Sequence, residues 1–209
     1  MTGESTAAVH LAGSDPVMAG LIREIGPMSL EKRRRGRPRG DAYGALLRSV
    51  VGQQLSVKAA ATIYERVLGL FGGSVPGPQE LLDAAPDDIR GAGLSGRKVE
   101  YLQDLARHVL SGELEVDRLA DLPDETVVEE ITAVRGLGVW TAHMFLMFHL
   151  GRPDVLPVGD LGIRNAVRTA YGLDEPPAPA ELERIAEPWR PHRTLACIYL
   201  WESLENAPA

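Results

Sequence analysis

The chain has 209 residues, 44% of them hydrophobic, enough to bury the core of one compact body or of two small lobes. No apolar run reaches the ~18 to 20 residues of a membrane-spanning helix, and residues 1–16 lack the pattern of a secretory signal, so we expect a cytoplasmic protein with no membrane partner. The single cysteine, Cys197, excludes an intrachain disulfide and any multi-cysteine zinc or iron–sulfur site.

The first part of the chain holds a short helix and a basic segment. Residues 1–12 are small and polar, and we expect them to be disordered, whereas residues 16–25 predict a helix. The formal net charge of −7 argues against a polyanionic partner, yet six of the 22 basic side chains lie between residues 32 and 39. Within that loop the sequence RGRP at 35–38 resembles the core of an AT-hook, a motif that binds the minor groove of DNA. A solvated basic loop accounts for the segment equally well.

From Ala42 onward the apolar residues recur at helical spacing. Two such stripes are Leu46, Leu47, Val50 and Val51, and then Ala60, Ile63, Val67 and Leu70. Gly/Pro-rich breaks separate short helices at residues 72–78, 91–96 and 122–123. Ser95 is the predicted N-cap of a helix over 97–110, and Asp124 that of a helix over 125–134. Because strand alternation is nearly absent, the sequence predicts an all-α fold.

The most informative pattern is a helix predicted to end near Val134, the turn Gly136-Leu137-Gly138, and a second helix that starts at once. The glycines permit a positive φ in a tight turn and let backbone N–H groups approach a phosphate with no Cβ in the way. The start of the second helix adds N–H groups and the positive end of the helix dipole. Such a clamp binds DNA with few charged side chains, although on its own the pattern is more often only a tight turn between helices.

Residues 134–142, VRGLGVWTA, resemble the hairpin of the helix-hairpin-helix DNA glycosylases. The signature of that superfamily is this hairpin, a Gly/Pro-rich loop and then an essential aspartate. In this chain the loop is 151–159 and the aspartate is Asp160. The resemblance implies that the hairpin contacts DNA, and the residues assigned to that contact are Gly136, Leu137, Gly138 and Thr141.

The resemblance covers most of the chain and implies a two-lobed, all-α fold with a central cleft. Residues 42–155 would form the central lobe, with the hairpin at 134–142, and residues 13–41 together with 156–209 the second lobe. The family hairpin often holds a monovalent cation, so a structural Na⁺ or K⁺ is expected at the backbone of residues 134–138 if any ion binds. No catalytic metal and no organic cofactor is implied.

Residues 51–60 resemble the segment that enters the minor groove beside the lesion in this family. Gln53, Gln54 and Leu55 are assigned to DNA contact, and either Gln54 or Leu55 would fill the gap that an extruded nucleotide leaves in the base stack. A buried helix cap made by the two glutamines is the competing interpretation. Residues 92–98 match another family stretch, to which we assign packing and no chemistry.

Asp160 precedes a predicted helix over 161–171 and is by its position an N-cap. The resemblance makes it also the catalytic carboxylate, which stabilises positive charge on the deoxyribose and accepts a proton from the attacking water. Trp201 falls where the family has an aromatic residue of the lesion pocket, and its indole would bind a cationic purine by stacking and cation–π attraction. Trp140 and Met144 are placed in the same pocket. Ordinary core packing is the alternative for Trp201, and for Trp189 in the similar C-terminal segment.

Position 140 bears on the type of reaction. Bifunctional branches of the superfamily, such as endonuclease III, have a lysine where Trp140 stands, and that lysine attacks the sugar. Since indole has no nucleophilic amine, we predict hydrolysis without strand cleavage. The four-cysteine iron–sulfur motif typical of those enzymes is also missing. This leaves a resemblance to the 3-methyladenine DNA glycosylase II branch.

The expected partner is therefore double-stranded DNA with alkylated purines of the 3-methyladenine or 7-methylguanine type, processed in base excision repair by a nucleoid-associated monomer. Two alternatives stay open. One is a non-catalytic module that recognises distorted DNA, with Asp160 serving only as a cap. The other is a glycosylase for deaminated or oxidised bases, because the sequence does not define the preferred lesion.

Overall fold

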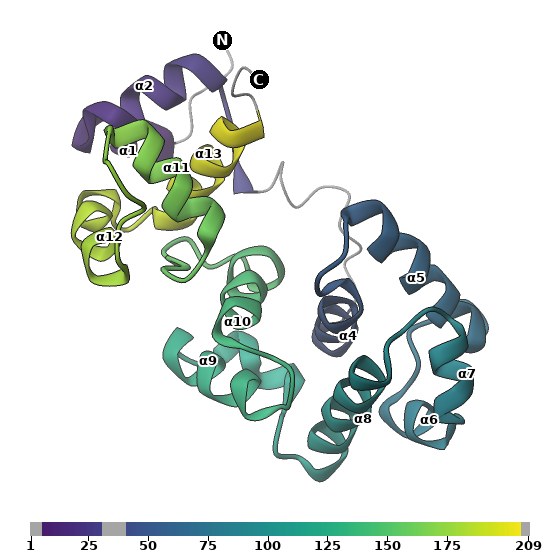
Figure 1. The fold of residues 1–209 in the computed structure, drawn as a ribbon. Coiled ribbons are helices and arrows are strands. Elements are labelled where there is room, and N and C mark those ends of the chain that lie inside the picture. The colour runs from purple at the N-terminus through teal and green to yellow at the C-terminus, as the bar shows by residue number, and fades with distance from the viewer. Residues whose placement is uncertain (1–5, 31–40, 206–209) are drawn as a thin grey trace. The chain divides into compact units, whose positions relative to one another are not determined.

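The computed structural model describes residues 6–30 and 41–205, and its regular elements are helices (Figure 1). The predicted all-α class is confirmed, since these two ranges contain no strand. No helix within the described ranges has the length and apolar character needed to cross a membrane. The basic segment at 32–39, with its AT-hook-like sequence, lies outside the described residues.

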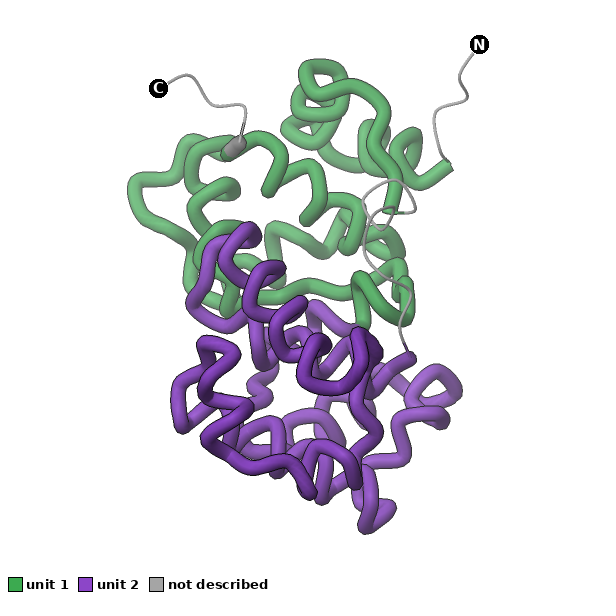
Figure 2. The backbone as a smooth tube through the Cα atoms, turned by 90° about the vertical axis from the view of Figure 1, so that its right-hand side faces the viewer, with its two compact units in different colours: residues 1–38, 146–209 green, residues 39–145 purple. Residues whose placement is uncertain are grey.

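The chain divides into two compact units, which Figure 2 draws in different colours. Unit 2 comprises residues 39–145, and unit 1 comprises residues 1–38 together with 146–209. The sequence places the second boundary at residue 155, whereas the structure places it at 145. The difference arises because the loop after residue 150 is hydrogen-bonded to a C-terminal helix of unit 1, where Thr194 N–H donates to the carbonyl of Pro153 at 3.0 Å.

Unit 2 is built around a helix, α4 (Ala42–Gly52), with a large buried face. Its elements are α4, α5 (Val57–Leu70), α6 (Pro78–Asp83), α7 (Pro86–Gly91), α8 (Gly96–Ser111), the 3-10 helix η1 (Val116–Asp121), α9 (Asp124–Ala133) and α10 (Val139–Phe145). Helix α4 packs against α5, α8 and α10, and α9 packs against α10. The predicted stripe on α4 is confirmed, because Leu46, Leu47, Val50 and Val51 have no exposed surface.

The second predicted stripe, on α5, is only partly right. Val67 is fully buried, but Leu70 is 46% exposed, and the other buried residue of this helix is Tyr64. Helix α5 packs against α4 and α7 along one side, so it needs a narrower apolar face than the sequence periodicity suggests.

Unit 1 is also helical. Its elements are α1 (Thr6–Ser14), α2 (Pro16–Ile25), the short π-helical segment η2 (Leu146–Leu150), α11 (Leu161–Tyr171), α12 (Pro179–Ile185), the 3-10 helix η3 (Glu187–Trp189) and α13 (Arg193–Glu205). Helix α13 packs against α2 and α11, and residues 195–200 are buried on every side of it. The helix predicted over 16–25 is confirmed, with Asp15 as its N-cap.

The prediction of disorder through residue 12 is wrong for residues 6–12, which form most of α1. Ala8 and Leu11 are buried in the packing of α1 against α2, η3 and α13. Residues 1–5 lie outside the described residues. Tertiary burial of two small apolar groups thus outweighs the polar character of the segment.

The predicted helix caps have different outcomes. Ser95 is confirmed, since its Oγ accepts the N–H of Lys98 at 3.3 Å. The assignment of Asp124 as an N-cap is wrong, because α9 starts at Asp124 itself and Pro123 takes the cap position. The carboxylate of Asp124 still lies in the first turn, where the helix dipole favours negative charge.

Candidate functional site

Asp160 is the N-cap of α11, as its position in the sequence predicts. Its Oδ1 accepts two hydrogen bonds, from the backbone N–H of Ile163 at 2.8 Å and from the indole Nε1–H of Trp201 at 3.1 Å. The residue is half-buried. Two N–H donors on one carboxylate oxygen fix the orientation of the group, and both suit an oxygen that bears negative charge.

Gly162 makes room for this pairing. A Cβ built on Gly162 would lie 3.0 Å from Asp160 Oδ1 and 3.2 Å from Trp201 Nε1, closer than such atoms ordinarily approach. On its other side Trp201 meets Phe148 of η2, with the two ring centroids 6.0 Å apart and an interplanar angle of 33°. Unit 1 therefore contains a carboxylate hydrogen-bonded to an indole, and a second aromatic ring lies close to that indole.

The loop that leads to Asp160 is tied to the start of α13. Arg193 donates from Nε to Asp154 Oδ1 at 2.7 Å and from Nη2 to the carbonyl of Asp154 at 2.7 Å. Thr194 Oγ1 donates to the carbonyl of Arg152 at 2.7 Å and accepts the N–H of Val155 at 3.1 Å. These side chains hold a loop with little regular structure, so that Asp160 starts α11 from a fixed position.

The thiol of Cys197 lies fully buried on α13. Burial raises the pKa of the Cys197 thiol, and the negative charge of Asp160 raises it further, whereas Arg193 acts in the opposite direction. Since a thiol is a nucleophile only when ionised, this burial disfavours Cys197 as a nucleophile. Asp160 stays the candidate reactive group of this site.

The hairpin of unit 2 turns at Gly136, whose φ is +88°. A Cβ there would lie 2.2 Å from ring atoms of Tyr101 on α8, so glycine is required both for conformation and for space. Gly138, in contrast, faces open space, with no atom within 4 Å of a Cβ built on it. At Gly136 the group that approaches the backbone closely is thus a ring of the protein itself. At Gly138 the backbone is accessible from outside.

Neighbouring side chains hold the hairpin in place. Asp104 Oδ2 accepts the backbone N–H of Arg135 at 2.9 Å, and the carbonyl of Gly136 accepts Nε2–H of Gln53 at 2.7 Å. Leu137 is 3% exposed and Thr141 is 5% exposed. The predicted DNA contacts of Leu137 and Thr141 have little surface to make them, because both residues are buried with their backbone, whereas Gly138 is exposed.

The segment after α4 places its three predicted residues in different surroundings. Gln53 is half-buried, and its side-chain amide binds the hairpin. Gln54 is exposed and has a left-handed φ of 58°. Leu55 is 37% exposed. A buried cap made by the two glutamines is therefore wrong. The cap of α5 is Ser56, whose Oγ accepts the N–H of Ala59 at 3.3 Å.

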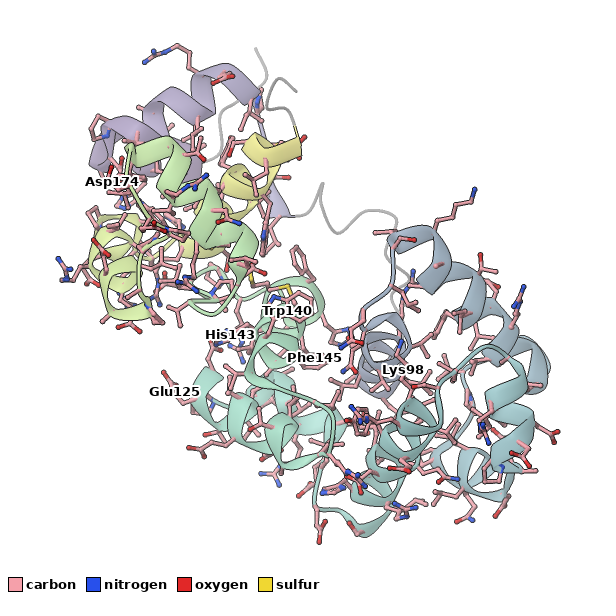
Figure 3. All side chains as sticks on the ribbon, viewed as in Figure 1. Lys98, Glu125, Trp140, His143, Phe145 and Asp174 are labelled. Carbon is pink, nitrogen blue, oxygen red and sulfur yellow. The ribbon has the colours of Figure 1, made fainter. Side chains whose placement is uncertain are left out.

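The remaining predicted pocket residues lie on α10 in unit 2. Figure 3 shows Trp140 on this helix, with His143 and Phe145 farther along it. Trp140 is 51% exposed and Met144 is half-buried. The structure thus brings Asp160 and Trp201 together within unit 1, while Trp140, Met144 and the hairpin belong to unit 2.

Residues 47–191 match the HhH-GPD superfamily of base excision DNA repair proteins. Over 99% of its length the chain is 33% identical to DNA-3-methyladenine glycosylase 1 of Schizosaccharomyces pombe, of which it covers 90%. The chain belongs to the HhH-GPD superfamily.

A solved structure of the Schizosaccharomyces pombe 3-methyladenine DNA glycosylase Mag1 in complex with abasic DNA superposes with a TM-score of 0.85. The two chains are 32% identical, and the match covers 97% of this chain and 98% of the other. YfjP of Bacillus subtilis is 32% identical over 78% of this chain, which spans 59% of the length of YfjP.

For this HhH-GPD chain, sequence reasoning missed four supporting residues: Phe148, Gly162, Arg193 and Lys98. Glycine in the first turn of a helix gives up about 1 kcal/mol of helix propensity, so Gly162 could have been recognised as a site of close approach. The contact partners of the other three, Phe148, Arg193 and Lys98, lie far away in the sequence. No local pattern therefore marks these residues.

A monovalent cation at the HhH-GPD hairpin would need backbone carbonyl oxygens as ligands. The carbonyls of Val134, Gly136 and Gly138 accept hydrogen bonds from Leu137 N–H, Gln53 Nε2–H and Ala142 N–H, at 3.1, 2.7 and 3.1 Å. Each carbonyl oxygen keeps a second lone pair, so these hydrogen bonds do not use up its capacity as an acceptor, and a Na⁺ or K⁺ at the hairpin stays a prediction. The described part of the chain has no group of three His, Cys, Asp or Glu side chains that could hold a metal ion.

Proposed function

We propose that this HhH-GPD protein is a DNA glycosylase that hydrolyses the N-glycosidic bond of alkylated purines, of the 3-methyladenine or 7-methylguanine type, in double-stranded DNA. The observation that carries the proposal is the Asp160 carboxylate, oriented by Trp201 Nε1–H at 3.1 Å and by the N–H of Ile163 at 2.8 Å. The names of the Schizosaccharomyces pombe relatives, a 3-methyladenine glycosylase bound in one structure to abasic DNA, support it.

The proposed chemistry follows from the charge of Asp160. As the bond between sugar and purine breaks, its electron pair leaves with the base, which departs neutral because the alkylated ring was cationic. The deoxyribose becomes an oxocarbenium ion, and at ~4 Å and an effective dielectric of ~20 a carboxylate stabilises it by about 4 kcal/mol, on the order of a thousandfold in rate. Water then adds to the sugar carbon and transfers its proton to Asp160.

Aromatic rings supply the proposed affinity for the base. Trp201 is hydrogen-bonded to Asp160 and its ring meets that of Phe148, and an indole face attracts a cationic purine by about 0.5 to 2 kcal/mol. Trp140 and Met144, on α10, stay further candidates for contact with the base. Because the cationic base is also a good leaving group, selectivity rests on chemistry as well as on fit.

DNA would be held mainly by backbone. The N–H groups at the start of a helix have no partner within the helix, and at Gly138 no Cβ blocks a phosphate from reaching them. Extrusion of the damaged nucleotide costs a few kcal/mol, which Gln54 or Leu55 would offset by filling the vacated space. Since Trp140 provides no amine, the product would be an abasic site in an uncut strand.

The test is incubation with methylated duplex DNA, scoring free bases and strand nicks separately. We expect release of 3-methyladenine and 7-methylguanine, with nicks only after treatment with alkali. Nicking without alkali would contradict the role given to Trp140, and release of no methylated base would contradict the glycosylase assignment. We also propose that the protein acts as a nucleoid-associated monomer, which sedimentation with and without DNA would check.

A further inference from the structure

Lys98 is bonded to the end of a neighbouring helix. Its Nζ donates to the carbonyl of Val51 at 2.8 Å and to the carbonyl of Gln53 at 2.6 Å, reaching from the first turn of α8 to the last residues of α4 (Figure 3). The last carbonyls of a helix lack partners within the helix and form the negative end of its dipole. Partial burial lowers the pKa of the Lys98 ammonium. With two of its three N–H donors used on backbone, Lys98 is a structural cation rather than a free amine.

Gln53 continues the connection from this turn to the hairpin. While its carbonyl is bound by Lys98, its side-chain Nε2–H donates to the carbonyl of Gly136 at 2.7 Å. The next residue, Gln54, has a φ of 58°, which costs a non-glycine residue about 1 kcal/mol or more and persists only where the surroundings impose it. Leu55 N–H then closes the turn on the carbonyl of Gly52 at 3.2 Å.

We infer that Lys98 and Gln53 are positioning residues, which set the exposed Gln54–Leu55 turn at a fixed distance from the phosphate-binding hairpin. The inference rests on the proposed function. Neither residue touches the sugar or the base. The geometry lets one duplex be held at Gly138 while the turn fills the space left by the extruded nucleotide. The hydrogen bond of 2.7 Å from Gln53 Nε2–H to the carbonyl of Gly136 joins the two loops, and the two bonds from Lys98, of 2.8 and 2.6 Å, hold the backbone around Gln53.

The experiment measures extrusion without cleavage. The full chain carrying Asp160→Asn is mixed with a duplex that has 2-aminopurine, which brightens on unstacking, beside a 7-methylguanine. The added variants are Lys98→Met, which keeps the length of the side chain but no donor, Lys98→Arg, which keeps donors, and Gln53→Leu. The control is Arg97→Met, which removes an exposed charge one residue away. Urea unfolding defines the conditions under which every variant is folded.

Loss of the two hydrogen bonds from the Lys98 ammonium should weaken binding to the lesion duplex about tenfold or more in Lys98→Met, with matching loss of brightening. Binding to undamaged duplex should change less than about threefold, since it rests on phosphate contacts. Lys98→Arg should restore extrusion, Gln53→Leu should resemble Lys98→Met, and Arg97→Met should brighten like the unmodified background. The salt dependence of binding should keep its slope in Lys98→Met.

Several results would overturn the inference. The slope of the logarithm of the binding constant against the logarithm of salt concentration could fall by about 1 in Lys98→Met. That result would make Lys98 a phosphate contact instead. Equal losses on damaged and undamaged duplex would show a general structural role, and full brightening of both Lys98→Met and Gln53→Leu would show that the turn needs neither residue. If the Asp160→Asn background itself does not brighten, the proposed function fails, and the inference that rests on it fails too.

Discussion

Replacing Gly162 by alanine separates stability from activity at the Asp160 site. The new Cβ would lie 3.0 Å from Asp160 Oδ1, 3.2 Å from Trp201 Nε1 and 3.3 Å from Trp201 Cδ1, so the indole must move by a few tenths of an ångström. Alanine adds up to about 1 kcal/mol of helix propensity, while a weakened hydrogen bond to a carboxylate loses part of about 1.5 to 3 kcal/mol. These terms oppose each other, and we expect the free energy of unfolding to change by less than about 2 kcal/mol.

Activity should respond differently, because displacing a reacting group by about 1 Å can cost on the order of a hundredfold in rate. A shift of a few tenths of an ångström should therefore slow the release of 7-methylguanine about tenfold under single-turnover conditions. The matched control is Gly20→Ala in α2, where a Cβ meets no atom within 4 Å, so helix propensity rises and base release stays unchanged. Release from Gly162→Ala at the rate of the unmodified protein would refute the role of the Trp201–Asp160 pairing.

Further predictions concern the hairpin and the core of unit 1. Gly136→Ala should lower the free energy of unfolding in urea by about 2 to 5 kcal/mol, because φ is +88° and Tyr101 occupies the space of a Cβ. Gly138→Ala should leave stability unchanged but weaken DNA binding, and the reverse pattern for the two glycines would contradict the hairpin geometry. Asp15 is 7% exposed, and Asp15→Asn should cost about 1 to 3 kcal/mol, since its carboxylate accepts hydrogen bonds from Tyr171 and Trp189.

Asp15 should also make stability depend on pH. Burial by itself raises the pKa of Asp15, but hydrogen bonds from Tyr171, Trp189 and the N–H groups of Met18 and Val17 outweigh it and leave that pKa below its ordinary value. The pKa of Asp15 is thus lower in the folded than in the unfolded protein, where it is about 4. The ionised carboxylate therefore stabilises the fold above about pH 4, and this stabilisation is lost as pH falls through the pKa of the folded protein. Thermal unfolding between about pH 5 and 2 should show a shallower acid loss in Asp15→Asn, and an identical slope would contradict this reading.

Much of the fold can be predicted from this sequence because its local signals are strong. The glycines and prolines mark the ends of most helices, and the caps Ser95 and Asp160 are side chains that bond to N–H groups three residues ahead. The α4 stripe is right because that helix is surrounded, and the α5 stripe fails because packing covers only one side of the helix. Helix α1 was missed because its stability comes from contacts that the segment itself does not encode.

Within the candidate site, the sequence predicts only the residues that the family pattern marks. Asp160 and Trp201 follow from the family pattern, and the structure pairs them across 41 positions of sequence. The supports around them do not follow. Lys98 lies 45 positions from Gln53, and Gln53 lies 83 positions from Gly136, so no periodicity or motif links these residues. Their contacts depend on how helices pack, which is set by the whole core.

If the negative charge of Asp160 drives loss of the base, the Asp160→Asn protein separates that charge from the cap position of the residue. Asn caps a helix about as well as Asp, so Asp160→Asn should fold normally and keep its affinity for lesion duplex. Its single-turnover release of 7-methylguanine should fall on the order of a thousandfold below that of the unmodified protein. A release rate from Asp160→Asn within about threefold of the unmodified rate corresponds to a change of less than 1 kcal/mol in the activation barrier. That result would contradict a driving role for the charge of Asp160.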